Sequence, residues 1–374
     1  MSWEDGVLED IVLLQRGFDI TKAEQKDGIV PVISSSGPKS FHNVAKVKGP
    51  GVVIGRKGTL GSVYYSEADF WPHDTTLWGK DLKGNDAKFV AYFLQTMDLG
   101  RFDTCASNPT LNRNHIHGLP IKKPDLATQE RIASILSAYD DLIENNRRRI
   151  ALLEQAARLL YREWFVHFRF PGHETAKFAD GLPEGWHRTE LSEVCSTNKA
   201  SHKKGKIPDP VRYIDIGSVS TGRIDGVTEY SAEDAPGRAR RIAEPMDTIW
   251  SNVRPNLQAY SLVMLPKEND VFSMGFTVIH AETISPLFVY LTVTTDDFVK
   301  YLTNHATGAS YPAVRSDDFD RAEILVPSDD LMKAFHEFVE PIFQQRQMLG
   351  ENNDQLTAAR DLLLPRLMDG RIPV

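Results

Sequence analysis

Cysteine is scarce in this chain of 374 residues, which holds only Cys105 and Cys195. The two lack the close pairing by which cysteines bind zinc, and two cysteines cannot build a disulfide scaffold. Few cysteines are typical of proteins in a reducing cytoplasm, where we do not expect these two to form a disulfide. The composition therefore predicts a cytoplasmic protein without a metal site.

Long apolar runs are also missing, because no stretch approaches the roughly 18 residues that a membrane span requires. The first ten residues, MSWEDGVLED, are acidic and lack the basic start and apolar stretch of a signal peptide. Hydrophobic residues make up 41% of the chain and charged residues 25%, as in soluble globular proteins. A chain of 374 residues exceeds one ordinary core and predicts two or three domains.

A basic excess is absent, since the formal net charge is −8. Residues 1–125 carry 15 basic and 15 acidic side chains, and residues 126–168 carry six of each. The acidic excess therefore lies in residues 169–374, which hold 22 basic and 30 acidic side chains. A protein that binds nucleic acid alone is usually basic, so this chain would need local basic patches or a partner.

Motifs of nucleotide binding and methyl transfer are missing as well. The Gly-rich stretch GPGVVIGRKGT approaches Lys57, but Arg56 stands where a phosphate-binding loop needs glycine. The run NPT at 108–110 is not the Asn-Pro-Pro-aromatic run of amino-methyltransferases. Neither segment predicts an enzyme.

Metal chemistry has little support in the sequence. None of the 11 histidines has metal-ligand spacing. His115 and His117 alternate with an apolar residue, as in a half-exposed strand. Asp74, Asp81 and Lys83 loosely match the core of a metal-dependent nuclease, but a lone D-x-K is a weak signal.

What the chain does have is an internal repeat. ASNPTLNRNHIHGLPIKKP (106–124) and ASYPAVRSDDFDRAEILVP (309–327) share Ala, Ser and Pro at one separation of 203. Trp3 matches Trp186 at a separation of 183, and ENN occurs at both 144–146 and 351–353, a separation of 207. The separations grow along the chain, as loop insertions would make them, and this colinear order indicates a duplication.

Each unit begins with a strand-rich part. Short β-branched runs stand between Gly, Pro, Ser and Asn and predict strands. The expected strands are 29–33, 51–55 and 62–65 in the first unit, and 212–219, 247–251 and 277–281 in the second. Helical patterns at 86–97 and 286–302 complete the two parts.

Each unit ends in a long helical pattern. The first runs from Pro124 to about Phe168, with Asp125 or Thr128 as candidate N-cap. Its apolar residues recur in heptads, which require a long partner helix. Residues 329–368 carry a matching stripe, with a bend expected at Pro341. The predicted core positions are Leu136, Tyr139, Ile143, Asn146, Ile150, Leu153, Leu160, Phe335, Ile342, Leu349, Leu356 and Leu363.

The two helices are expected to pair within the chain. About 40 residues at 1.5 Å each give a rod of roughly 60 Å, and a polar Asn146 in the core would fix its register. The alternative is a helical hairpin that merely closes the fold. The predicted domains are a first globular domain (1–125), a first helical region (126–168), a linker (169–182), a second globular domain (183–327) and a second helical region (328–374).

Polar loop residues collect at corresponding places in both units. Arginine can bridge two acceptors on guanine and asparagine two groups on adenine, whereas serine, threonine and lysine mainly bind phosphate. Each residue alone fits an ordinary solvated loop equally well, so the prediction depends on their collection. The candidate nucleic-acid contacts are Ser34, Ser35, Ser36, Arg56, Lys57, Thr59, Asn108, Thr110, Asn112, Arg113, Ser251, Asn252, Arg254, Asn256, Tyr311 and Arg315.

Four segments resemble one known family along nearly the whole chain. QERIASILSAYDDLIENNRRRIALLEQAARLLYREWF (129–165) and NNDQLTAARDLLLPRLMDGRI (352–372) are similar to the central and distal helical regions of the specificity (S) subunits of type I restriction–modification systems. LPEGWHRTELSEV (182–194) resembles the entry to a second target-recognition domain. GVVIGRKGTLG (51–61) resembles the strand and loop of a recognition domain.

The resemblance implies an α+β fold with two target-recognition domains, two long antiparallel helices forming a coiled coil, and a pseudo-twofold repeat. Each recognition domain would read one half of a split double-stranded DNA target, and the helices would set the gap. The chain itself would be non-catalytic and would hold no cofactor. Two modification subunits, adenine methyltransferases using S-adenosylmethionine, would dock on the helices, and restriction subunits using ATP and Mg would join them in defence against foreign DNA.

Two alternative functions, from other classes of protein, remain possible on the sequence alone. One is a structural adaptor whose paired domains bind proteins. The other is a nuclease that uses Asp74, Asp81 and Lys83.

The missing basic excess generates a first prediction. We expect the isolated chain to bind DNA weakly and with little specificity, because it cannot release many counterions from the duplex without a partner. Labelled DNA is titrated with the chain alone and with the chain assembled with methyltransferase subunits, at matched salt. Equal, tight and specific binding by both would contradict the prediction.

Overall fold

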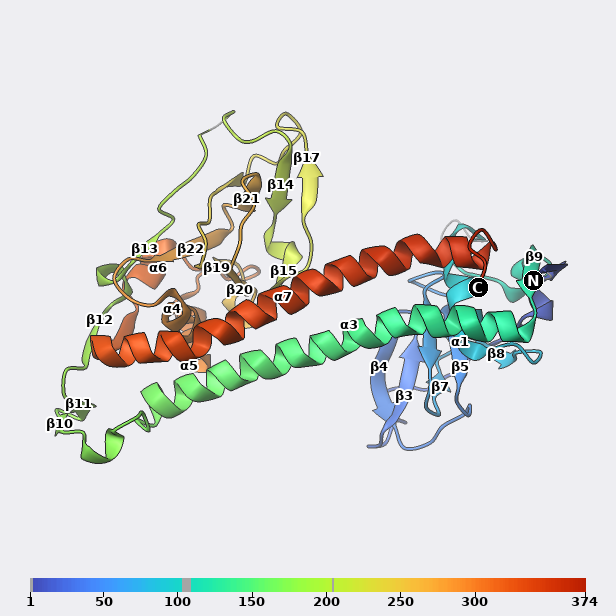
Figure 1. Cartoon of the computed structure of the whole chain (residues 1–374), viewed down its shortest axis with the longest axis horizontal. Coiled ribbons are helices and arrows are strands. Elements are labelled where there is room, and N and C mark those ends of the chain that lie inside the picture. The colour runs from blue at the N-terminus through green and yellow to red at the C-terminus, as the bar shows by residue number, and fades with distance from the viewer. Residues whose placement is uncertain (1–2, 103–108, 204) are drawn as a thin grey trace. The chain divides into compact units, whose positions relative to one another are not determined.

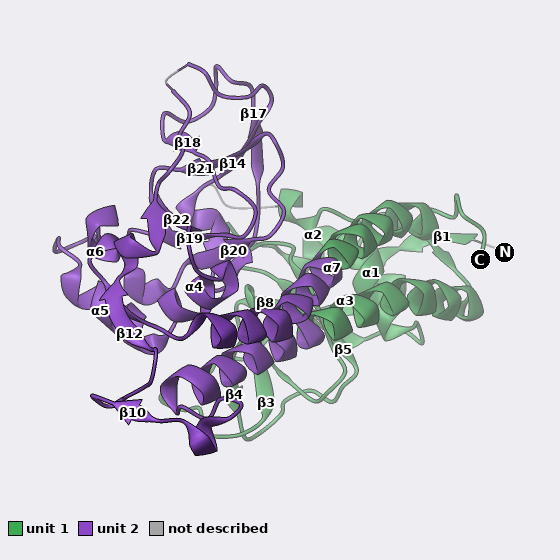
Figure 2. Cartoon of the chain, turned by 60° about the vertical axis from the view of Figure 1, so that its left-hand side comes forward, with its two compact units in different colours: residues 1–147, 351–374 green, residues 148–350 purple. Residues whose placement is uncertain are grey.

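The computed structural model describes residues 3–102, 109–203 and 205–374 (Figure 1). The chain forms two compact units, unit 1 with residues 1–147 and 351–374 and unit 2 with residues 148–350 (Figure 2). Each unit therefore joins one globular domain to part of both long helices. Helices and sheets are both extensive, so the α+β class is confirmed. Within the described residues, no helix is both long and apolar enough to cross a membrane.

Unit 1 is built on a four-stranded sheet of order β2-β8-β5-β6, against which helix α1 packs. Its inner strand β5, GVVIG, is buried along its whole length because it lies between two neighbours and under the helix. A second sheet has the order β4-β3-β7, and β1 pairs with β9, so the two ends of the domain meet. The elements are β1 (Trp3–Val7), β2 (Leu13–Arg16), β3 (Val30–Ser34), β4 (Gly37–His42), β5 (Gly51–Gly55), β6 (Val63–Ser66), β7 (Trp71–Pro72), β8 (Thr76–Asp81), α1 (Ala87–Gln95), α2 (Arg113–Ile116) and β9 (Pro120–Pro124).

Unit 2 repeats this plan. Its main sheet has the order β13-β22-β19-β20, its second sheet the order β17-β14-β21-β18, and β12 pairs with β23 as β1 does with β9. Two hairpins, β10–β11 and β15–β16, are additional. The elements are β10 (Phe178–Ala179), β11 (Leu182–Pro183), β12 (His187–Glu190), β13 (Cys195–Thr197), β14 (Val211–Ile214), β15 (Val219–Ser220), β16 (Arg223–Ile224), β17 (Thr228–Tyr230), β18 (Ala239–Arg241), β19 (Asp247–Ser251), β20 (Tyr260–Val263), β21 (Asp270–Ser273), β22 (Phe276–Ala281), α4 (Pro286–Val293), α5 (Asp296–His305), α6 (Ser316–Asp320) and β23 (Glu323–Val326).

The duplication is also visible in the isolated β-bridges of the backbone, which occur at equivalent positions in both units. Lys57 forms an isolated antiparallel bridge with Thr110, and Val253 forms one with Ala313. Residues 57 and 253 are 196 apart and residues 110 and 313 are 203 apart, so both bridges join equivalent positions of the repeat. The shared separation of 203 in the sequence thus reflects one loop that crosses the same strand end in both units.

The long helices α3 (Leu126–Tyr161) and α7 (Asp329–Met368) are antiparallel within each unit. The Asp125 carboxylate accepts a hydrogen bond from the Thr128 amide at 2.9 Å, so Asp125 is the N-cap of α3. That bond to the charged form also lowers the pKa of Asp125. Helix α7 continues through Pro341.

The heptad positions of both helices turn inward. Leu136, Ile143, Phe335 and Leu349 are buried, and the other predicted core positions are partly buried. In unit 1 the Asn146 side chain donates to the Asn353 side chain at 3.0 Å, so the repeated ENN motif meets itself across the helix pair. A paired asparagine penalises other registers, because a shift would leave buried amides without partners.

A tyrosine, a carboxylate and an arginine tie the globular domain to both helices in unit 1. The Tyr92 hydroxyl on α1 donates to Asp140 on α3, and Arg360 on α7 donates to the same carboxylate at 2.6 Å. Burial, with Asp140 beside the hydroxyl, raises the pKa of Tyr92. We call this three-residue contact the unit 1 junction.

Unit 2 has a junction of the same chemistry. The Tyr290 hydroxyl on α4 donates to Glu154 on α3 at 2.8 Å, and Arg346 on α7 pairs with Glu154 at 3.2 Å. Arg158 adds a second ion pair to Glu154 at 2.8 Å and a bond to the Thr294 hydroxyl at 3.0 Å. Burial raises the pKa of Tyr290. In each unit, therefore, one carboxylate on α3 contacts both a helix of the globular domain and the other long helix.

Three local expectations were wrong. The strand expected at 212–219 ends at Ile214, because the Asp215 side chain accepts from the Ser218 amide and starts a helical turn before β15. Residues His115 and His117 do not lie on a strand, because the Asn112 side chain caps the short helix α2 by accepting from the Asn114 amide at 3.0 Å. The pattern at 286–302 is two helices, α4 and α5, because the Thr295 side chain caps a new helix by accepting from the Phe298 amide at 3.3 Å. All three side-chain caps override the apolar periodicity.

The unit 1 junction generates a second prediction. Tyr92→Phe should destabilise the seat of α1 on α3 by about 1–3 kcal/mol, because it leaves Asp140 one hydrogen bond short in a half-buried site. Hydrogen exchange of residues 87–95 and 126–147 measures the loss. The matched control is Tyr65→Phe, which removes an exposed bond to Glu67 and should change exchange little. Equal effects of the two variants would contradict the role of the junction.

Candidate nucleic-acid interface

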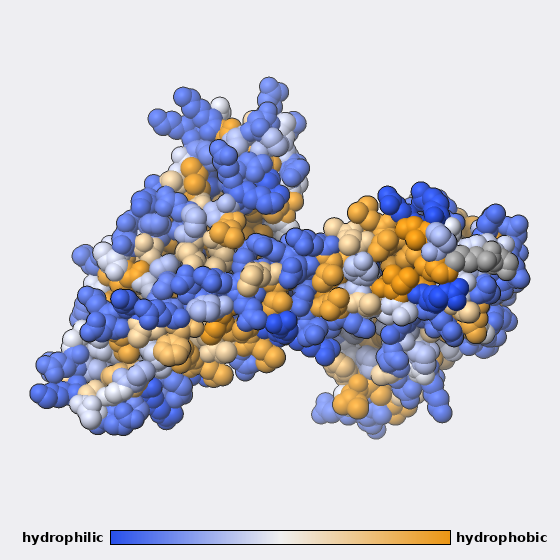
Figure 3. Space-filling view, viewed as in Figure 1, coloured by the Kyte–Doolittle hydropathy of each residue, from blue (hydrophilic) through white to orange (hydrophobic). Residues whose placement is uncertain are grey.

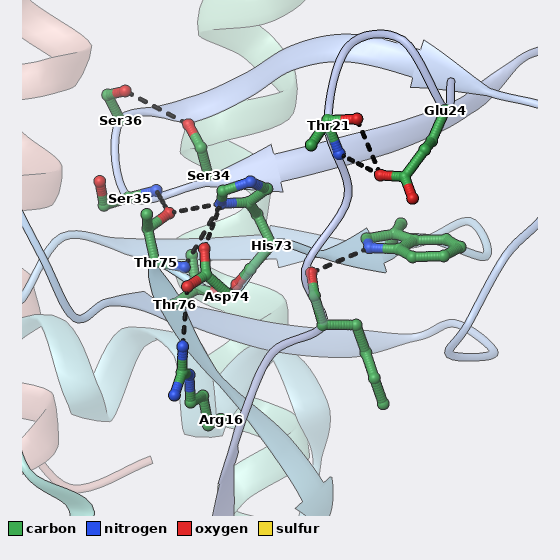
Figure 4. A network of polar contacts seen from close by, with 12 residues as sticks. Arg16, Thr21, Glu24, Ser34, Ser35, Ser36, His73, Asp74, Thr75 and Thr76 are labelled. Atoms are coloured by element: carbon green, nitrogen blue, oxygen red, sulfur yellow. Dashed lines mark hydrogen bonds and ion pairs between the residues drawn. The ribbon is translucent and has the colours of Figure 1, made fainter. Parts of the chain in front are cut away.

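Three loops of unit 1 converge on Thr75, which precedes β8. The amides of Arg56 and Lys57 donate to the Thr75 carbonyl at 2.8 and 3.0 Å. The Ser35 amide donates to the Thr75 hydroxyl at 3.3 Å, and the His73 ring bonds the same hydroxyl at 3.0 Å (Figure 4). The sequence placed Ser35 in one loop and Arg56 and Lys57 in another, and the fold brings the three residues into one cluster.

The serines of the β3–β4 turn are largely engaged in holding that turn. The Ser34 hydroxyl donates to the Gly37 carbonyl at 3.0 Å and lies 3.3 Å from the Ser36 hydroxyl (Figure 4). The Ser35 carbonyl accepts from Ser62 at 2.6 Å. These bonds shape the turn, while Ser36 stays exposed at its tip.

Arg56 has the most unusual surroundings of the unit 1 candidates. Its Nη1 atom is buried without a hydrogen-bond partner among the described residues. Burial lowers its pKa, the neighbouring Arg16 lowers it further, and Asp74 acts in the opposite direction. A buried guanidinium donor that lacks an acceptor is costly, which sets Arg56 apart from the other candidates of unit 1.

The remaining unit 1 candidates differ in availability. Thr59 is exposed and Lys57 is half-buried, whereas Thr110 lies in the bridge to Lys57. Asn112 is the cap of α2, and the Arg113 guanidinium lies 3.5 Å from the Leu14 carbonyl, so both have local structural contacts. The last candidate, Asn108, lies outside the described residues.

In unit 2 the candidates gather around an arginine stacked on a tyrosine. The Arg254 guanidinium lies 4.6 Å from the centre of the Tyr311 ring and donates to the Ser310 carbonyl at 3.2 Å. Its backbone has a φ of 52° and donates to the Pro312 carbonyl at 2.7 Å. Tyr311 is 69% exposed, so this stacked pair is a rigid cationic and aromatic surface open to solvent.

Of the other unit 2 candidates, two make local hydrogen bonds within the domain and two are exposed to solvent. Ser251 is buried and donates to the Val253 carbonyl at 3.2 Å, and Asn252 accepts from Thr277 at 2.7 Å. Asn256 and Arg315 are exposed beside the stacked pair in sequence. Ser251 and Asn252 therefore brace the strand end that carries Arg254.

A nuclease centre does not form from the three residues that suggested one. Asp74 stands before β8 and pairs with Arg16 at 2.8 Å, whereas Asp81 ends β8 and pairs with Lys83 at 3.2 Å. Opposite ends of a six-residue strand cannot share one metal ion. A different group in the described part, Asp19, His73 and Asp74, has its ligand atoms within 4.8 Å of one another, but Arg16 already neutralises Asp74.

Sequence reasoning missed Arg16, Lys46, Trp71 and the role of Asp74. Asp74 lies 58 residues from its partner Arg16, and no periodicity links the two. Lys46 lies 4.9 Å from the Trp71 ring centre, again a contact between distant loops. The only signal was the placement of Arg16 at the end of an apolar strand run.

Comparison with known proteins agrees with this geometry. Residues 1–155 match the model of the type I restriction modification DNA specificity domain. The chain is 23% identical over 308 residues to the specificity subunit of the type I restriction enzyme MjaIX of Methanocaldococcus jannaschii, an alignment covering 77% of this chain and 69% of that protein. It is 24% identical over 336 residues to the HindI specificity subunit of Haemophilus influenzae, covering 71% of each.

A solved structure has the same fold. The S subunit of a type I restriction–modification system from M. genitalium superposes with a TM-score of 0.64 at 16% identity, covering 98% of this chain and 96% of the other. The duplicated α+β units, with their two long helices, thus share the fold of that S subunit. Residues 1–155 are thus similar to a type I DNA-specificity domain, and most of the chain is similar to specificity subunits of type I restriction enzymes.

The stacked pair of unit 2 generates a third prediction. Arg254→Ala should cost about 1–3 kcal/mol of discrimination at one base pair, if the guanidinium makes a paired contact to guanine. Competition binding of the chain assembled with its methyltransferase subunits, against DNA changed at each position, measures this. The control is Arg321→Ala, an exposed arginine paired with Asp318 at 3.2 Å. Loss spread evenly over all DNA sequences would instead assign Arg254 to phosphate.

Proposed function

We propose that this chain is the non-catalytic DNA-reading subunit of a type I restriction–modification complex, with one half of a split asymmetric target read by each unit. The single observation that carries this is the duplication, in which one fold is repeated with different side chains at the same loop positions. Unit 1 presents Arg56 beside Thr75, and unit 2 presents Arg254 on Tyr311. Two domains with the same backbone fold but different loop side chains are suited to binding two different half-sites.

The candidate contacts differ in their proposed tasks. Arg56 and Arg254 read bases, because a guanidinium can bridge two acceptors, and Arg254 is also held by the Tyr311 ring and the Ser310 carbonyl. Lys57, Thr59 and the serines of the β3–β4 turn bind phosphate and set the position of the duplex. Exposed Asn256 and Arg315 extend the contact in unit 2.

The long helices offer surfaces for partner subunits. On α3, Ile135 and Leu142 are exposed in unit 1, and Leu152 and Leu159, with Val166 just beyond α3, in unit 2. Within each set the spacing is seven residues, so each forms a stripe beside the buried core. Apolar surface lies over the C-terminal part of α3 in Figure 3. We assign these stripes to the helices of two methyltransferase subunits, one for each unit.

The chemistry of the complex lies with those partners. The modification subunits carry S-adenosylmethionine and transfer its methyl group to an adenine extruded from the duplex. Restriction subunits carry ATP and Mg. The acidic balance of unit 2 fits a division in which partner subunits supply much of the phosphate contact.

Paired insertions generate a fourth prediction and test the function. Seven residues inserted after Arg147 and seven after Gly350 leave every contact inside each unit unchanged, because both sites lie at the boundary of the units. Seven residues preserve the heptad phase and add about 10 Å of helix, or about three base pairs. Methylation sequencing of DNA exposed to the assembled complex should show both half-sites unchanged and a gap longer by about three base pairs.

The control is insertion after Arg147 alone, which lengthens α3 without lengthening α7 and should reduce activity without a new defined gap. Altered half-sites with an unchanged gap would contradict the two-part reading. Absence of any sequence-specific methylation by the unaltered complex would favour the protein-binding adaptor.

A further inference from the structure

A hollow of about 460 Å³ opens on the surface of unit 1, lined by residues that the sequence did not mark. Its wall consists of Arg16, Gly17, Phe18, Asp19, Lys46, Trp71 and Asp74. We propose that this hollow receives the edge of a base pair of the DNA target, with Arg16 as a base-reading residue and Asp74 as its positioning residue. The proposal rests on the proposed function and names a specificity-determining contact within it.

Arg16 is exposed but held in one direction. Its side chain is 56% exposed, and its Nη2 atom donates to Asp74 at 2.8 Å, a carboxylate that is itself only 20% exposed (Figure 4). A guanidinium has five N–H donors in a rigid fork, and this bond uses one of them. The ion pair therefore orients the arginine while leaving donors for two acceptors, which is the pattern of O6 and N7 on guanine.

The base of the hollow is rigid. The Trp71 indole is buried and donates to the Phe18 carbonyl at 3.2 Å, and the two rings meet edge to face at 6.4 Å. Lys46 lies over both rings, 4.9 Å from Trp71 and 5.8 Å from Phe18. These contacts fix the floor beneath Arg16 and place a second cation at the rim for a phosphate.

The hollow adjoins the Thr75 cluster. Asp74 precedes Thr75, whose carbonyl accepts the amides of Arg56 and Lys57. Ser35 bonds the Thr75 hydroxyl from the β3–β4 turn (Figure 4). Arg16 ends β2 and pairs with Asp74, and Arg56 follows β5 and bonds the next residue, Thr75, through its amide, so the two arginines belong to one reading surface.

Other ligand classes fit the hollow less well. A metal ion at Asp19, His73 and Asp74 would have to displace Arg16 from Asp74 and compete with Lys46. A free anion would meet two carboxylates, and an apolar ligand would meet four charged side chains. The edge of a base carries both hydrogen-bond acceptors and donors, so it can pair with both the cationic and the anionic side chains that line the hollow.

The test uses the full chain assembled with its methyltransferase subunits. Methylation sequencing first defines both half-sites of the unaltered complex. Competition binding then compares DNA changed singly at each position for Arg16→Ala, Arg16→Lys and Asp74→Asn. We expect Arg16→Ala to lose roughly 5- to 150-fold discrimination at one guanine-containing base pair of one half-site, with the other half-site unchanged.

The two further variants separate reading from charge and from folding. Arg16→Lys keeps the cation but not the fork, so affinity at matched salt should persist while discrimination falls. Asp74→Asn removes the charge that holds Arg16 and should give a smaller loss at the same position. The control is Arg188→Ala, an arginine 57% exposed and paired with Glu323 at 3.2 Å in unit 2, which should leave both half-sites unchanged.

The outcomes that overturn the proposal are distinct. Uniform weakening on all sequences with a shallower salt dependence assigns Arg16 to phosphate. Discrimination that disappears when a chelator is added to the binding assay assigns the hollow to a cation. A complex that reads two half-sites but is indifferent to Arg16 refutes this inference alone, whereas a complex without any bipartite target refutes the proposed function.

Discussion

In each unit, one partly buried carboxylate joins the globular domain to both long helices. Asp140 accepts from Tyr92 and Arg360, and Glu154 accepts from Tyr290 and pairs with Arg346, so that a domain helix, α3 and α7 meet on one charge. Removing any one partner leaves a half-buried charge short of a bond, which makes the three-part contact cooperative. A domain that reads DNA at fixed positions needs such a seat, because a small rotation on the helix would displace every loop contact.

The duplication divides the molecule into what is repeated and what is not. The strand order of the main sheet, the bridge from 57 to 110 with its counterpart from 253 to 313, and the long helix after each domain recur. The charged groups on this scaffold do not recur, since Arg56 faces Arg16 and Asp74 in unit 1 while Arg254 stacks on Tyr311 in unit 2. Under the proposed function, a common backbone with independent side chains would let each half-site vary without disturbing the other.

Under the proposed function, the charge of the chain would separate the reading of bases from the binding of phosphates. The arginines that are best placed to read bases are each restrained by a neighbour: Arg16 by Asp74 and Arg254 by Tyr311 and the Ser310 carbonyl. A restrained arginine discriminates better between bases because its side chain loses less conformational freedom on binding. An arginine that is already paired is, however, less available to bind phosphate. The net charge of −8 is therefore consistent with a subunit that supplies selectivity to partners that supply affinity.

Local patterns in the sequence were sufficient for the long helices, their heptad faces, the strands 51–55 and 247–251 and the repeat itself, because periodicity and turn residues act over short distances. Side-chain caps at Asn112 and Thr295 overrode that periodicity where it was short. The tertiary structure alone decided which polar residues meet. The pairing of Arg16 with Asp74, the convergence of three loops on Thr75 and the seating of Tyr92 on Asp140 join residues dozens of positions apart, and such contacts depend on strand order and register rather than on any local pattern.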